Sequence, residues 1–142
     1  MRQFVTGPGR AEMDLEAQLR KLGLDVEMWP GFDAYDLRVT FPGGYTWAVD
    51  VKDWKHPGLL GRAARAVPHE PPYDEACWAV PAEQADAHRD YLGTYYRNRT
   101  SQAEGLPLLT DRQLIALARD RLRGDTSVRL TTARSANGAA HA

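Results

Sequence analysis

The stretch "YDLRVTFPGGYTWAVDVKDW", residues 35–54, decides the fold. It contains two runs in which apolar and polar side chains alternate, as in β-strands that bury one face. Pro42-Gly43-Gly44 between the runs is a hairpin signature. Asp36, Asp50 and Lys52 therefore share one face of the predicted hairpin. The odd-numbered residues predict an apolar face on the other side, made of Tyr35, Leu37, Val39, Phe41, Trp47, Val49 and Val51.

The charged face of this hairpin allows two registers and two interpretations. In the first register the loop is residues 42–44, and Asp36 lies opposite Asp50. In the second register each paired arm is one residue longer, and Asp36 lies opposite Lys52. Facing aspartates repel each other unless a cation lies between them. Asp36, Asp50 and the carbonyl of Val51 offer the oxygen ligands that Mg²⁺ takes, and Lys52 would lie within reach of an attacking water or a phosphate. The competing interpretation is that these charges are the solvated face of an ordinary hairpin.

The segment before the hairpin predicts an amphipathic helix that starts near Thr6 and stops at Gly23. Leu15, Leu19 and Leu22 form its apolar stripe. Continued towards the N-terminus, this stripe reaches Glu12, so Glu12 is expected to point inward or to the edge of the core. Glu16 is expected to face solvent or an arginine.

The rest of the sequence predicts the order α-β-β-β-α-β-α, followed by a strand near "LPLL" and a last helix. A short helix is expected within 57–67, a buried strand at "ACWAV" with Cys77 in the core, and one helix over 81–99. Residues 1–124 would form one domain, and residues 125–142 are small, polar and without periodicity, which predicts a flexible tail. The chain has no long apolar run and no signal peptide, so we expect a cytoplasmic protein without a membrane anchor.

Glu12, Asp36 and "Asp50-Val51-Lys52", in this order, resemble the three motifs of the PD-(D/E)xK nuclease superfamily. "RAEMDLEAQLRKLG" also looks like the opening helix of archaeal Holliday-junction resolvases. The resemblance implies an α/β (α+β) restriction-endonuclease-like core, with a mixed sheet flanked by helices. It further implies a Mg²⁺-dependent endonuclease, with Mn²⁺ as a substitute, in which the three acids and the Val51 carbonyl bind the metal. Lys52 would be the catalytic lysine. One departure is that Tyr35 stands where many members have a proline.

"WPGFDAYDLRVTFPGGYTWAVDVKDW" resembles the restriction-endonuclease-like protein encoded beside prokaryotic Piwi proteins and a helicase. That resemblance implies a defence system against invading DNA. The candidate partners are DNA, a Piwi-like protein, a helicase and a second copy of the chain. Arg62, Arg65 and Trp54 are the predicted nucleic-acid contacts. The formal net charge of −1 gives no overall basic excess, which favours DNA delivered by partners. The alternative is a catalytically inactive subunit that binds nucleic acid or a Piwi or helicase partner.

Overall fold

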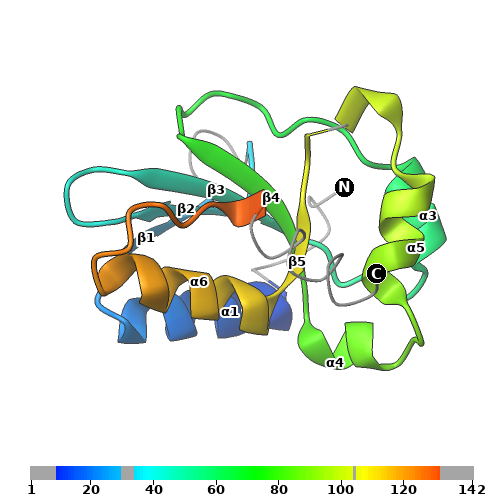
Figure 1. Cartoon of the computed structure of the whole chain (residues 1–142), viewed down its shortest axis with the longest axis horizontal. Helices are drawn as coiled ribbons and strands as arrows, with labels where there is room; N and C mark the ends of the chain where they lie inside the picture. Colours follow the sequence, from blue (N-terminus) through cyan, green and yellow to red (C-terminus); the bar gives the residue numbers. More distant parts are fainter. Residues whose placement is uncertain (1–8, 30–33, 104, 132–142) are drawn as a thin grey trace.

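The computed structural model describes residues 9–29, 34–103 and 105–131 as a five-stranded sheet between two layers of helices (Figure 1). The strands lie in the order β1-β2-β3-β4-β5 and span Asp25–Met28, Leu37–Thr40, Thr46–Val51, Glu75–Val80 and Leu108–Thr110. Helices α1 (Arg10–Lys21) and α6 (Asp111–Leu122) cover one face. The other face carries α3 (Pro57–Arg62) and α5 (Tyr91–Asn98). The predicted restriction-endonuclease-like α+β class is confirmed.

The order of elements agrees with the prediction from α1 through β4, and β5 and α6 follow as expected. The single helix predicted over 81–99 is wrong, because the chain forms α4 (Ala82–Asp86) and then α5. The side chain of Asp90 accepts a hydrogen bond from the backbone N–H of Gly93, so it caps a new helix. A short 3₁₀ helix (Ser101–Ala103) leads to β5. Within the described ranges, no helix combines the length and the apolar character needed to span a bilayer.

Of the two predicted registers, the hairpin of β2 and β3 has the one with a three-residue loop. Leu37 pairs with Val49 and Thr40 with Thr46, and the N–H of Phe41 donates to the carbonyl of Tyr45 at 2.8 Å. The loop is therefore residues 42–44. The paired residues end at Leu37 and Val49, and Asp36 lies one residue before β2, where its side chain instead of its backbone accepts the N–H of Val51.

The two faces of the sheet have separate apolar cores, and Tyr35 lies in a different one from that predicted. Leu37, Val39 and Trp47 pack towards α1 and α6, whereas Tyr35 packs with the cluster under α3 and α5. Tyr35 precedes β2 in a bend, so strand alternation does not extend to it. Its hydroxyl donates to the carbonyl of Pro71 at 2.8 Å.

Helices α3 and α5 approach each other closely at Gly61. A β-carbon added there would lie 2.6 Å from the carbonyl oxygen of Tyr95 and 2.9 Å from the β-carbon of Asn98. We expect Gly61→Ala to lower the free energy of unfolding by about 1–3 kcal/mol, the usual cost of overpacking. The matched control is Gly58→Ala in the same helix, because the nearest atom to its added carbon is 3.6 Å away. Urea unfolding of both variants tests this, and equal stabilities would contradict it.

The segment after α6 packs against the domain core instead of leaving it. Val128 and Leu130 are buried, and the backbone N–H of Leu130 donates to a carboxylate oxygen of Glu75 at 3.0 Å. Figure 1 shows this orange-to-red segment returning from the end of α6 towards β4. The domain core therefore extends past the predicted boundary at residue 124, and the expectation of a flexible tail does not describe residues 125–131. Residues 132–142, like the predicted helix start at Thr6, lie outside the described residues.

Candidate active site

Asp50 and Lys52 lie together at the carboxyl end of β3. The N–H of Lys52 donates to the carbonyl of Ala79 at 2.7 Å, so the parallel pairing with β4 continues one residue past the strand. Strand alternation then directs Asp50 and Lys52 to the same face. The Nζ atom of Lys52 is 3.3 Å from Oδ2 of Asp50, and their side chains are 24% and 20% exposed. Both groups are thus held in place while still reachable from solvent.

Asp36 is buried directly before β2, at the same edge of the sheet. Its side chain is 1% exposed, and its Oδ2 accepts a hydrogen bond of 2.7 Å from the N–H of Val51. Its own carbonyl accepts a 2.8 Å bond from the N–H of Trp29. The carboxylate of Asp36 therefore lies against the peptide between Asp50 and Val51. Asp36 thus contacts the backbone of Val51, the residue between Asp50 and Lys52, and a shared ion between the Asp36 and Asp50 carboxylates stays a prediction.

Glu12 reaches this edge of the sheet through Trp29. The indole Nε1 of Trp29 donates to Oε2 of Glu12 at 3.3 Å, and the backbone of Trp29 bonds to Asp36 as described above. Glu16, by contrast, forms a 2.9 Å ion pair with Arg20 on the same helix. The expectation that Glu16 faces an arginine is confirmed. The predicted role of Glu12 as a metal ligand stays a prediction, because its described contact is with the indole.

The chemistry of the oxygen donors at this edge suits a hard divalent cation. Two carboxylates, Asp36 and Asp50, and the carbonyl of Val51 are the kind of ligands that Mg²⁺ takes alongside water molecules. Among the residues that the structure describes, no group of three or more His, Cys, Asp or Glu side chains gathers as a metal site. The two aspartates and the carbonyl are therefore suitable oxygen ligands, and the contribution of Glu12 as a third carboxylate stays a prediction.

The predicted nucleic-acid contacts lie on the α3 and α5 side of the sheet. Arg62 and Arg65 are exposed, and Trp54 is 38% exposed. The hydroxyl of Tyr91 donates to the carbonyl of Trp54, and burial raises the pKa of Tyr91 to about 12, so this donor keeps its proton. Arg62 lines a shallow hollow of about 500 Å³ with His56 and His88. The role of Arg62, Arg65 and Trp54 in nucleic-acid binding stays a prediction.

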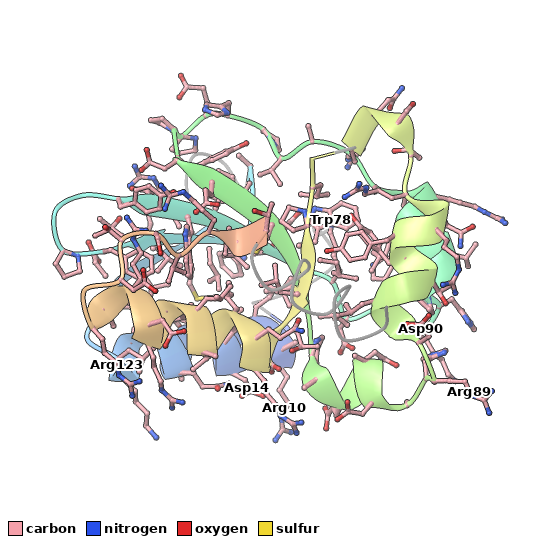
Figure 2. The ribbon with its side chains drawn as sticks, in the orientation of Figure 1. Arg10, Asp14, Trp78, Arg89, Asp90 and Arg123 are labelled. Carbon is pink, nitrogen blue, oxygen red and sulfur yellow. The ribbon has the colours of Figure 1, made fainter. Side chains whose placement is uncertain are left out.

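A second group of acids lies in a different cleft of about 520 Å³, where α1, α4 and α6 begin. Figure 2 shows Arg10 and Asp14 on the α1 side of this region. Asp53 accepts a 3.0 Å bond from the side chain of Gln84, and Asp111 accepts bonds of 3.0 and 2.8 Å from the N–H groups of Ala82 and Arg112. These carboxylates thus hold the helix starts together.

Sequence reasoning missed Trp78, which lies beside the site on β4. The Nζ atom of Lys52 is 4.7 Å from the centroid of the Trp78 ring, and Trp78 is directly opposite Asp50 in the parallel pairing. Periodicity indicates that "ACWAV" is a buried strand, but it does not reveal which strand lies next to β3 or in what register. A pairing between segments separated by more than twenty residues carries no local signal.

The sheet order, the flanking helices and the Asp36, Asp50 and Lys52 group define a restriction-endonuclease-like protein. A family model described as "REase associating with pPIWI_RE" matches residues 9–126. The chain belongs to that family, and its name denotes a nuclease-type domain associated with pPIWI. Searches of curated proteins and of solved structures gave no match.

Proposed function

We propose that this protein is a metal-dependent endonuclease that hydrolyses phosphodiester bonds in DNA, as part of a defence system against invading DNA. The observation that carries the proposal is the position of Asp36, Asp50 and Lys52 at the end of β3, in a member of a restriction-endonuclease-like family. Hydrolysis of a phosphodiester needs a bound cation and a group that stabilises the negative charge developing on the phosphate. Two carboxylates could bind the cation, and the ammonium group could stabilise the charge.

Each residue of the site would have a distinct part in the reaction. Asp36 and Asp50, with the Val51 carbonyl, would hold Mg²⁺ or Mn²⁺, and Glu12 would contribute through a water molecule. The ion would supply Lewis-acid stabilisation of the phosphate. The ammonium group of Lys52 would donate a hydrogen bond to a phosphate oxygen or orient the water that attacks phosphorus. Because Asp36 is buried and bonded to the Val51 N–H, its carboxylate is fixed before substrate arrives.

The second candidate function is a subunit that has the fold of a nuclease without cleaving DNA. Two observations favour it: Lys52 is already paired with Asp50, and the described acids do not form a three-carboxylate metal site. In this case the exposed Arg62, Arg65 and Trp54 would bind nucleic acid, or another surface would bind the Piwi partner.

We further propose that the partners deliver the DNA. The net charge of −1 provides little electrostatic attraction to a phosphate backbone. A Piwi protein, as the family description indicates, and a helicase would then bring the strand to Lys52, and a second copy of the chain would allow both strands to be cut.

The deciding experiment is cleavage of supercoiled plasmid and of single-stranded DNA, by the full chain alone and with its Piwi and helicase partners. Reactions contain Mg²⁺, Mn²⁺ or EDTA. We expect nicking or cutting with either ion and none with EDTA. Absence of cleavage with every partner and both ions would overturn the enzyme proposal and favour the non-catalytic subunit.

A further inference from the structure

Lys52 has two neighbours of different chemistry, the carboxylate of Asp50 and the ring of Trp78. Nζ lies 3.3 Å from the carboxylate and 4.7 Å from the ring centroid. A cation at this distance from an indole face is attracted by the negative potential of the ring. Unlike a carboxylate, the ring does this without neutralising the charge of the ammonium group.

The sheet fixes the ring where Lys52 can reach it. Trp78 pairs directly with Asp50 in the parallel β3–β4 ladder, and the backbone N–H of Trp78 donates to the carbonyl of Pro107 at 3.0 Å. The side chain is 3% exposed and belongs to the core cluster that includes Tyr95, whose ring centroid is 6.4 Å away. Figure 2 shows Trp78 between the sheet and α5. A buried ring held by two strands and a helix provides a rigid surface.

We infer that Trp78 is a positioning residue that holds the ammonium group of Lys52 at the reaction centre. This inference rests on the proposed nuclease function. If Asp50 turns its oxygens to a divalent cation, its attraction for Lys52 is shared with that cation. The indole ring is then the described contact that keeps Lys52 beside the site without competing for the ion. Asp50 would thereby bind the metal ion, and Trp78 would hold the ammonium group of Lys52.

The kinetic test compares Trp78→Phe and Trp78→Leu under conditions where both are folded. Phenylalanine keeps an aromatic face and should retain most activity, whereas leucine should lower kcat on the order of tenfold with KM unchanged. Trp47 is the matched control, because it is equally buried but lies in the opposite core cluster. Trp47→Leu should lower the melting temperature but leave kcat near the wild-type value at a permissive temperature. Equal losses of kcat in Trp47→Leu and Trp78→Leu, or none in Trp78→Leu, would overturn the inference.

A second measurement needs no cleavage and separates this inference from the proposed function. The ε-methylene protons of Lys52 should show an upfield ring-current shift in the NMR spectrum. The chain has three lysines, so loss of the signal in Lys52→Ala assigns it. The shift should vanish in Trp78→Leu and persist in Trp47→Leu. An unshifted Lys52 signal in the wild-type protein would refute the positioning role. A shifted signal in a protein that cleaves no DNA would uphold the Lys52–Trp78 contact but overturn both the nuclease proposal and the catalytic role of that contact.

Discussion

Replacing Asp50 by asparagine is expected to reduce DNA cleavage on the order of a hundredfold or more while the protein stays folded. Asparagine has nearly the shape of aspartate but carries no charge for a divalent cation. The change removes the repulsion that we expect between two neighbouring carboxylates, and it also removes the ion pair with Lys52. Because these effects oppose each other, we expect little change in the melting temperature without metal.

Lys52→Ala should reduce cleavage to a similar extent for a different reason, since the metal ligands remain. The matched control is Asp53→Asn, one residue further along, because Asp53 is exposed and its described contact is with Gln84. Plasmid nicking with Mg²⁺ and melts with and without Mg²⁺ measure the three variants. If Asp50→Asn and Lys52→Ala cut as fast as Asp53→Asn and the wild-type protein, Asp50 and Lys52 are not catalytic.

The second large effect concerns stability, at Leu130. This side chain is fully buried in the core under α1 and α6, so Leu130→Ala should lower the free energy of unfolding by about 2–5 kcal/mol. A domain of this size has on the order of 5–15 kcal/mol in total, so the loss is a large fraction of its stability. Truncation after Gly124 should cost more, because it also removes buried Val128 and the bond between Leu130 and Glu75.

The control for this prediction is Thr126→Ala, in the same segment but with an exposed side chain. Its carbonyl, which accepts a 2.8 Å bond from Arg129, is unchanged by the substitution. Denaturant unfolding followed by circular dichroism gives the three free energies. A truncated chain as stable as the full one would restore the boundary at residue 124 and show that the packing of residues 125–131 adds no stability.

The sequence allowed the hairpin and its charged edge to be predicted because both are local. The alternation of side chains and the Pro-Gly-Gly loop specify which face Asp50 and Lys52 share, and only the choice between two registers needed the structure. Gly43 and Gly44 both adopt positive φ, near 93° and 97°, which explains why glycines occupy the loop. The helical stripe likewise separated Glu12 from Glu16.

The features that the sequence did not predict depend on contacts between distant segments, or on one or two residues within a longer periodic pattern. Trp78 lies beside the site because β4 pairs in parallel with β3, and the periodicity of the side chains does not predict this pairing. Val128 and Leu130 are two apolar residues in a polar segment, and their burial follows from packing against the core under α1 and α6. Asp90 ends one helix pattern and caps the next, although the spacing of apolar residues suggested a continuous helix.

The central claim is that Asp36 and Asp50 hold a divalent cation beside Lys52. The most direct measurement is Mn²⁺-induced broadening of backbone amide NMR signals, since a paramagnetic ion broadens the signals nearest to it even when it binds weakly. We predict the strongest broadening at Val51 and Lys52, and its loss in Asp50→Asn. Broadening centred on the cleft of Asp53 and Asp111, or unchanged broadening in Asp50→Asn, would contradict the claim.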